Sequence, residues 1–187
     1  MEGLFWILKV KKVSLFLFSL LKLLWRVDMN KIVDAIIEIP YRSQNKFEIK
    51  NGRVKLDRVL YSAMAYPAEY GYIEETLAED GDALDILVIG TEPTFPGCVV
   101  PARVIGVLMI KDNGFEDAKI ISVTDVDPRY NEVHELKDLS KFMLDEIKNF
   151  FENYKTLQNI DVEVGEYYSK EEAFRLIEEA KNRYLEK

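Results

Sequence analysis

Three carboxylates lie close together in the middle of the chain, within residues 79–88. Asp80, Asp82 and Asp85 are spaced i, i+2 and i+5, and an apolar run over residues 86–89 follows at once. Asp and Gly disfavour regular structure, so the acids should lie on a turn that leads into a buried strand. Carboxylates that converge repel one another unless cations neutralise them. The stretch therefore predicts an oxygen-only site for hard divalent cations.

Other charged and aromatic residues favour a larger site. More acids stand on early strands and at a later strand–strand turn: Glu38, Glu48, Asp112, Glu116 and Asp117. Cations that could complement them are Lys46, Arg58, Lys119 and Lys155, and tyrosines are dense over residues 61–72. Each of these residues alone could be an ordinary surface or packing residue. Together they suggest a phosphate-rich anion clamped between metal ions and Lys or Arg.

The totals exclude several classes of protein. At 187 residues the chain is expected to be one domain, and its net charge of −8 argues against general nucleic-acid binding. The single cysteine, Cys98, and the single histidine, His134, exclude a Cys-based zinc site and a His–His metal motif. The acidic turn is also no EF-hand, because its twelfth position is Thr91 rather than Glu. These facts indicate a cytoplasmic protein with an oxygen-ligand metal.

Residues 1–27 differ from the rest of the chain. They are strongly apolar and carry a net charge of +4, which leaves −12 for residues 28–187. A membrane-surface helix and a signal or anchor are two interpretations, although the uninterrupted apolar run is too short to span a membrane. The favoured interpretation is a basic apolar extension, residues 1–28, that the folded domain at 29–187 does not need. Met29 would be a natural start.

After this extension, polar and apolar residues alternate as in the strands of a β-rich domain, and helices are expected toward the C-terminus. Strands are expected over residues 33–39, 46–49, 54–59, 84–89, 99–110 and 118–123, with Asn51-Gly52 as a hairpin turn. Short strands at this spacing favour a small barrel. The expected class is α+β, a small closed five-stranded OB-like β-barrel with flanking C-terminal helices.

Two helices are expected near the C-terminus. Ser140 should cap the first, which runs to about residue 154, and Ser169 with Glu172 should form a capping box for the second, which runs to about residue 184. The apolar face of the first helix comprises Met143, Ile147, Phe150, Phe151 and Tyr154. That of the second comprises Ala173, Leu176, Ile177, Ala180 and Tyr184.

The acidic stretch Asp80-Gly81-Asp82-Ala83-Leu84-Asp85 resembles the signature of the soluble family I inorganic pyrophosphatases. Ala83 stands where that family usually has Pro or Glu, a position that is no ligand. The resemblance extends from residue 32 to the C-terminus in family order. Its further blocks are Ile37-Glu38-Ile39-Pro40, Asn45-Lys46-Phe47-Glu48, Leu56-Asp57-Arg58, Tyr66-Pro67-Ala68-Glu69-Tyr70-Gly71-Tyr72, Asp112 with Glu116-Asp117-Ala118-Lys119, and Phe150-Phe151-Glu152-Asn153-Tyr154-Lys155. Asn113 stands where some members carry an acid.

The resemblance implies Mg²⁺-dependent hydrolysis of inorganic diphosphate to two orthophosphates. A metal-bound water would be the nucleophile and Asp82 its general base, with several Mg²⁺ ions in each site. The implied metal ligands are Asp80, Asp85, Asp117, Asp112, Glu38 and Glu48, with Asp85 bridging two metals. The implied substrate-binding residues are Lys46, Arg58, Lys119, Tyr154, Lys155, Tyr70 and Tyr66. The resemblance also implies a homo-oligomer, commonly a hexamer among bacterial-type relatives.

Two other classes remain open from the residues alone. A non-catalytic divalent-metal-binding module would use the same acids but would leave Lys46, Arg58 and Lys155 unexplained. An oligonucleotide-binding barrel would share the fold, but a face lined with acids would repel a phosphate backbone. We therefore expect no nucleic-acid partner, and contact of residues 1–28 with a membrane remains the less favoured alternative.

Overall fold

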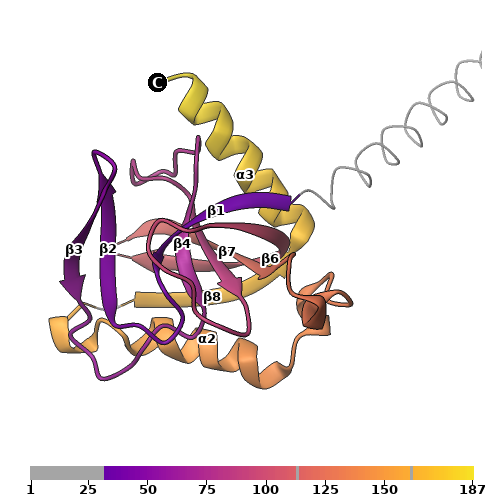
Figure 1. Ribbon diagram of the computed structural model, residues 1–187, viewed down its shortest axis with the longest axis horizontal. Coiled ribbons are helices and arrows are strands. Elements are labelled where there is room, and N and C mark those ends of the chain that lie inside the picture. Colours follow the sequence, from indigo (N-terminus) through magenta and orange to yellow (C-terminus); the bar gives the residue numbers. More distant parts are fainter. Residues whose placement is uncertain (1–31, 113, 161) are drawn as a thin grey trace, which may run out of the picture. The chain divides into compact units, whose positions relative to one another are not determined.

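The computed structural model describes residues 32–112, 114–160 and 162–187 (Figure 1). Residues Ile32–Lys187 form one compact unit. The expected extension, residues 1–28, lies outside the described residues. The strands are β1 (Ile32–Ile39), β2 (Asn45–Lys50), β3 (Arg53–Val59), β4 (Glu69–Ile73), β5 (Asp85–Ile89), β6 (Val99–Asp112), β7 (Phe115–Thr124) and β8 (Val162–Ser169). The helices are α2 (Lys141–Asn153), α3 (Lys170–Leu185) and the short 3-10 turns Pro128–Tyr130, Leu136–Asp138 and Thr156–Gln158.

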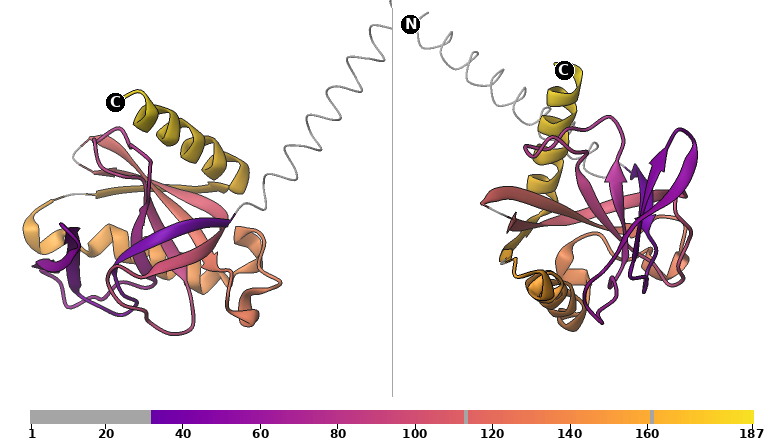
Figure 2. Two further views of the ribbon diagram at one scale, coloured as in Figure 1. Left: turned by 45° about the horizontal axis from the view of Figure 1, so that its top comes forward. Right: turned by 90° about the vertical axis from the view of Figure 1, so that its left-hand side faces the viewer.

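Five strands close into a ring. Their order is β1-β4-β5-β7-β6, and β6 pairs again with β1, which confirms the closed five-stranded OB-like barrel. β8 extends the sheet by pairing with β6, while β2 and β3 form a separate hairpin (Figures 1 and 2). The pairing of β5 with β7 is parallel, whereas the other pairings of the barrel are antiparallel. The barrel leaves none of its five strands as a free edge.

Both faces of the barrel wall are covered, which explains the continuous apolar run of β5. Ile86 and Val88 pack in one hydrophobic cluster with Ile177 of α3. Leu87 and Ile89 point the other way, into a second cluster that includes side chains of α2. Successive residues of a strand face opposite sides, so a strand buried on both sides must be apolar throughout. β5 is therefore fixed between two cores.

The helices begin where the sequence predicts, but one cap differs. The Ser140 hydroxyl accepts a hydrogen bond from the Met143 N–H at 3.2 Å, which confirms the cap of α2. Ser169 occupies the N-cap position of α3 without a capping hydrogen bond from its side chain, so the predicted capping box is wrong. Glu172 instead pairs with Arg175 at 2.6 Å. Tyr184, predicted on the inner face of α3, is 46% exposed.

Two strands, β4 and β8, were not predicted from the sequence. Each contains a glycine, a residue that is depleted in strands and obscures their pattern. A Cβ atom on Gly71 of β4 would lie 1.9 Å from the backbone oxygen of Ile36 in β1. One on Gly165 of β8 would lie 2.9 Å from the backbone oxygen of Met109 in β6. The glycines that hide these strands thus permit close backbone contact.

Among the described residues, no helix is long and apolar enough to cross a membrane.

We predict that Gly71→Ala will lower the free energy of unfolding by at least about 2 kcal/mol, because the added methyl group would collide with the backbone of β1. Urea unfolding followed by circular dichroism measures the change. Gly90→Ala is the matched control, since its Cβ would meet its nearest atom, in Thr124, at 3.5 Å. Equal stability of the two variants would contradict the proposed close approach.

Candidate active site

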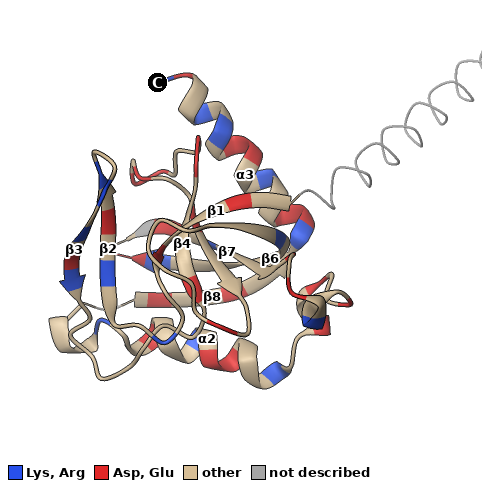
Figure 3. Ribbon diagram, viewed as in Figure 1, with Lys and Arg blue, Asp and Glu red and all other residues tan. Residues whose placement is uncertain are grey.

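A pocket of about 340 Å³ opens beside the start of β5. Five of the predicted site residues line it: Glu38, Lys46, Glu48, Asp82 and Asp85. They come from β1, β2, the acidic turn and β5, so the barrel and the separate hairpin both contribute to the pocket. Figure 3 shows charged residues of both signs on β2, which faces this region. The structure thus brings together residues that are up to 47 positions apart in sequence.

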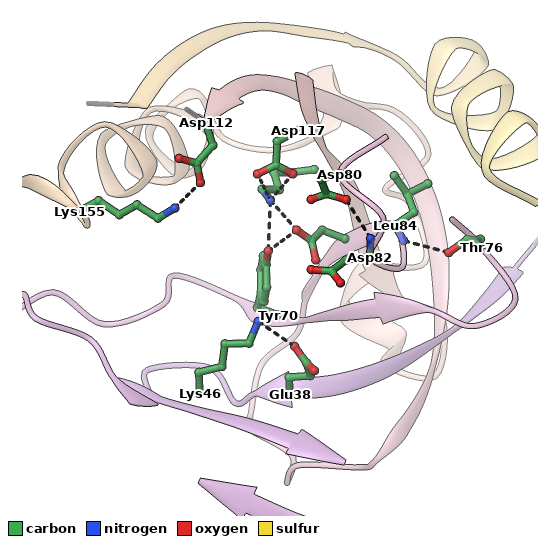
Figure 4. Close-up of polar contacts among 12 residues, drawn as sticks. Glu38, Lys46, Tyr70, Thr76, Asp80, Asp82, Leu84, Asp112, Asp117 and Lys155 are labelled. Carbon is green, nitrogen blue, oxygen red and sulfur yellow. Dashed lines mark hydrogen bonds and ion pairs between the residues drawn. The ribbon is translucent and has the colours of Figure 1, made fainter. Parts of the chain in front are cut away.

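The Lys119 ammonium lies among the acids next to the pocket. Its Nζ atom is 2.5 Å from Asp85 Oδ2 and 2.6 Å from each carboxylate oxygen of Asp117. Tyr70 completes the group, with its hydroxyl 3.2 Å from the ammonium and donating to Asp85 at 2.5 Å (Figure 4). The parallel register of β5 and β7 pairs Ile86 with Ile120 and so sets Asp85 beside Lys119.

Burial and like charges shape the electrostatics of this cluster. Burial raises the pKa of Asp117 above its usual range; the nearby Lys119 opposes this, and the charges of Asp85 and Asp80 add to it. Burial works against the Lys119 charge, yet the two adjacent carboxylates raise the pKa of its ammonium overall. Burial likewise raises the pKa of Glu38, against the effect of Lys46. The cluster therefore favours additional positive charge.

Each predicted phosphate-binding cation already has a carboxylate partner. Lys46 lies 3.3 Å from Glu38, and Lys155 pairs with Asp112 at the far side of the cluster (Figure 4). Arg58 pairs with its neighbour Asp57 at 3.0 Å and stands opposite Lys46 in the β2–β3 hairpin. Lys46, Lys119 and Lys155 are therefore each paired with a predicted metal ligand, whereas Arg58 is paired with Asp57.

Three predicted tyrosines are packed beneath the acids. The rings of Tyr66 and Tyr70 lie 5.0 Å apart, and Phe150 of α2 contacts both Tyr66, at 4.5 Å, and Tyr154, at 5.2 Å. Burial, followed by nearby negative charge or another tyrosine, raises the pKa of all three hydroxyls. The hydroxyls therefore stay protonated near neutral pH and can donate hydrogen bonds.

The acidic turn holds its first two carboxylates at the surface. Asp80 and Asp82 are exposed, and the Asp82 N–H donates to Asp80 Oδ1 at 3.1 Å. Gly81 between them has φ +94°, a conformation that L side chains rarely adopt. The turn thus points both acids toward the pocket side of the barrel, where Figure 4 shows them near Asp117.

The donor chemistry fits a hard divalent cation. In the described part of the chain, no three Asp, Glu, His or Cys side chains are arranged to hold one metal ion as they stand. The Lys119 ammonium lies between Asp85 and Asp117. The converging donors are nevertheless all carboxylate oxygens. His134 lies elsewhere, 3.4 Å from an Arg103 nitrogen, and Cys98 packs against a hydrophobic cluster. Among the described residues, the histidine and the cysteine therefore form no soft or imidazole-based metal site.

Two polar residues that line the pocket, Lys50 and Tyr72, were not predicted as site residues from the sequence. Lys50 pairs with Glu48 at 2.6 Å, and Tyr72 lies beside Glu38, whose charge helps burial to raise the tyrosine pKa. Lys50 follows Glu48 by two positions on β2, so strand alternation could have placed both on one face. The same alternation from Tyr70 leads to Tyr72, but only once residues 69–73 are recognised as a strand.

Comparison with known proteins agrees with this geometry. The family model for inorganic pyrophosphatase matches residues 35–185. The inorganic pyrophosphatase of Geobacillus stearothermophilus is 57% identical over 159 residues, covering 84% of this chain and 96% of the relative. The crystal structure of the Thermus thermophilus enzyme has 40% identity and a TM-score of 0.78 over 82% of this chain and 91% of its own. The Helicobacter pylori enzyme has 40% identity and a TM-score of 0.80, over 83% and 95% respectively.

The closed barrel and its carboxylate–cation pocket therefore define a hydrolase of the OB-like pyrophosphatase architecture. The chain belongs to the soluble family I inorganic pyrophosphatases, and it hydrolyses inorganic diphosphate with the help of divalent metal. The resemblance noted from the sequence is confirmed, and the non-catalytic metal-binding module is set aside.

We predict that Lys119→Met will destabilise the fold by about 3–5 kcal/mol, because two partly buried carboxylates would lose their shared cation. Urea unfolding without added divalent cations measures this change. Lys141→Met is the control, since the Lys141 side chain is 87% exposed and pairs with Asp145 along the α2 surface. A loss of stability no larger than that of the control would show that the ammonium does not hold the acids together.

Proposed function

We propose that this chain hydrolyses diphosphate with several Mg²⁺ ions and with Asp82 as the general base toward the attacking water. One observation carries the proposal: acids and cations from the barrel, the acidic turn, the hairpin and α2's C-terminal end converge on a single region. Family membership supports the reaction, and the residues of this chain support the roles assigned below.

The metal ligands are proposed to be Asp80, Asp85, Asp117, Asp112, Glu38 and Glu48, with Asp85 shared between two ions. When bound, Mg²⁺ would offset the negative charge of diphosphate and lower the pKa of water that it holds. Asp85 suits a shared role because it faces both the pocket and the Lys119 cluster. The raised pKa of Asp117 indicates a carboxylate whose charge a nearby cation would stabilise.

The proposed substrate contacts lie around these acids. Lys46, Arg58, Lys119 and Lys155 would bind the phosphate oxygens and offset charge that develops on the leaving phosphate. Tyr70, Tyr154 and Tyr66 would donate hydrogen bonds or line the site, since burial keeps their hydroxyls protonated. Tyr70 also orients Asp85 through the hydrogen bond of 2.5 Å that it donates.

Proton transfer is assigned to Asp82 for reasons of position. Asp82 lines the pocket, and among the described residues its carboxylate takes part in no ion pair or side-chain-to-side-chain hydrogen bond, whereas Asp85 and Asp117 bind the Lys119 ammonium. A carboxylate exposed to the pocket can accept a proton from the attacking water and then release it to solvent. Asp85 on β5 and Asp117 on β7 are less suited to this proton transfer, because each is bound to the Lys119 ammonium.

Release of orthophosphate from diphosphate tests the proposal as a whole. Activity should require Mg²⁺ and should fall when fluoride or Ca²⁺ is added. A folded protein that binds Mg²⁺ but releases no phosphate would contradict the proposed function.

Asp82→Asn should lower kcat by about 10²- to 10⁴-fold, because the amide cannot accept the proton. The fold and the binding of Mn²⁺ should be retained, since Asp82 is an exposed side chain on the turn. Glu79→Gln removes a neighbouring exposed acid from the same turn and should leave kcat close to that of the wild type. A near-normal kcat for Asp82→Asn would refute the general-base assignment.

Asp85→Asn should weaken divalent-cation binding by at least about tenfold and lower activity together with it. The change removes the charge that faces both the pocket and the Lys119 cluster. Titration of activity with Mg²⁺ and direct titration with Mn²⁺ measure the two effects. An unaltered dependence on Mg²⁺ would count against the shared-ligand role.

The assembly and location of the chain are also proposed on the basis of resemblance. We expect a cytoplasmic homo-oligomer, a hexamer as in bacterial-type relatives. Large apolar side chains that a subunit contact could cover include Val126, 71% exposed, and Phe142, 75% exposed. Light scattering of the purified protein measures the assembly.

Deletion of residues 1–28 should leave diphosphatase activity within about twofold of the full chain, because the compact unit begins at Ile32. The truncated chain would start at Met29. Activity and oligomer size should be compared between the two forms, together with sedimentation on anionic vesicles. Loss of folding or assembly on truncation would show that the extension is structural rather than dispensable.

A further inference from the structure

The tip of the turn that carries Asp80 and Asp82, residues 79–82, is exposed. Both acids are exposed, whereas Ile73 before the turn and Leu84 after it are buried. A functional side chain holds its place only as well as the backbone beneath it. The positions of the two acids therefore depend on the hydrogen bonds made between residues 73 and 84.

Thr76 joins the two ends of this turn. Its side chain is buried, with 3% of the residue exposed. The hydroxyl donates to the Ile73 oxygen at 2.5 Å. It also accepts a hydrogen bond from the Leu84 N–H at 2.9 Å (Figure 4). The Ile73 N–H in turn donates to the Leu84 oxygen at 3.0 Å. Thr76 thus ties the strand that enters the turn to the strand that leaves it.

The C-terminal helix holds the residue next to Thr76. The Leu77 N–H donates to the Ala180 oxygen at 2.9 Å, and the Arg183 Nε donates to the Leu77 oxygen at 2.8 Å. Both main-chain groups of Leu77 are therefore bound by α3, although Arg183 lies 106 positions away in sequence. Within the turn itself, the Ala78 N–H donates to the Asp82 oxygen at 2.7 Å.

α3 is itself fixed to the barrel. Ala173, Ile177 and Ala180 are buried in the same hydrophobic cluster as Leu84 of the turn, and Ala78 packs against that cluster. A helix anchored by three buried residues offers a fixed support for Leu77. Contacts therefore connect the barrel core to α3, through the hydrophobic cluster, and α3 to the acidic turn, through Leu77.

We propose that Thr76 and Arg183 are positioning residues that set the affinity of the site for divalent cations by fixing the backbone beneath Asp80 and Asp82. Neither side chain lines the pocket. The inference rests on the proposed function, because it assumes that these acids serve metal binding and proton transfer. It adds that α3, which does not line the pocket, helps to position the acidic turn through its hydrogen bonds to Leu77.

Two variants remove the contacts, and two serve as matched controls. Thr76→Val keeps the shape but deletes both hydroxyl hydrogen bonds, and Thr76→Ser restores them. Arg183→Met removes the donor to Leu77 and keeps most of the apolar stem. Arg175→Met removes another arginine of α3, one that pairs only with Glu172 and Glu179 on the helix surface. All measurements use the full-length protein well below the melting temperature of each variant.

Thr76→Val and Arg183→Met should each weaken Mn²⁺ binding, followed by electron paramagnetic resonance of the free ion, by about 5- to 10-fold. The Mg²⁺ concentration for half-maximal diphosphatase activity should rise in parallel, while kcat at saturating Mg²⁺ falls less. Thr76→Ser and Arg175→Met should bind Mn²⁺ as the wild type does. The restoration by serine ties the effect to the hydroxyl.

Unchanged Mn²⁺ affinity in both test variants would overturn the inference, even if their melting temperatures fell, since the contacts would then be structural only. Equal weakening by Arg175→Met would also overturn it, because the effect would come from general damage to α3. Should Thr76→Val fail to fold, Arg183→Met decides the matter alone. A wild-type protein without Mg²⁺-dependent phosphate release would instead contradict the proposed function, which the wild-type assay reveals separately.

Discussion

The site depends on one electrostatic constraint: carboxylates must face one another in a partly buried place without driving the structure apart. The Lys119 ammonium meets this constraint in the protein itself, at 2.5 Å from Asp85 and 2.6 Å from Asp117. Burial alone would disfavour the positive charge of Lys119. Two ion pairs and a hydrogen bond to the Tyr70 hydroxyl stabilise this charge. The shared ammonium holds the two carboxylates close together, and this closeness is what a divalent cation with carboxylate ligands needs.

The barrel provides the geometry for this constraint. Closure of the ring through β1 and β6 fixes all five strands, and the parallel β5–β7 pair sets Asp85 next to Lys119. α2 supports the tyrosines from one side through Phe150, and α3 supports the acidic turn from the other through Leu77. Asp85 and Asp117 therefore lie on strands that are packed on both faces, whereas Lys46, Glu48 and Arg58 lie on the separate β2–β3 hairpin.

Local features were predictable from the sequence, and non-local ones were not. The acidic turn, the buried strand behind it and the Ser140 cap depend on residues a few positions apart, and the structure confirms them. The strand at 69–73 was missed because Gly71 interrupts the pattern of side chains that predicts a strand. The glycine is needed there because β1 approaches closely, which is a contact that the local sequence does not show. The hold of α3 on Leu77 joins residues 106 positions apart and has no local signal. The residue roles still come from resemblance, because single charges on strands carry little information by themselves.

The pairing of every proposed phosphate-binding cation with a carboxylate has a thermodynamic consequence. A polyanion that bound these cations would have to replace their present partners, which are Glu38, Asp57, Asp85, Asp112 and Asp117. Each exchange releases a carboxylate, and a released carboxylate attracts a divalent cation. Anion and cation therefore recruit each other through the same set of side chains, and by linkage each should bind more tightly in the presence of the other. On this reasoning, the site would favour the binding of the anion and the metal ions together over the binding of either alone.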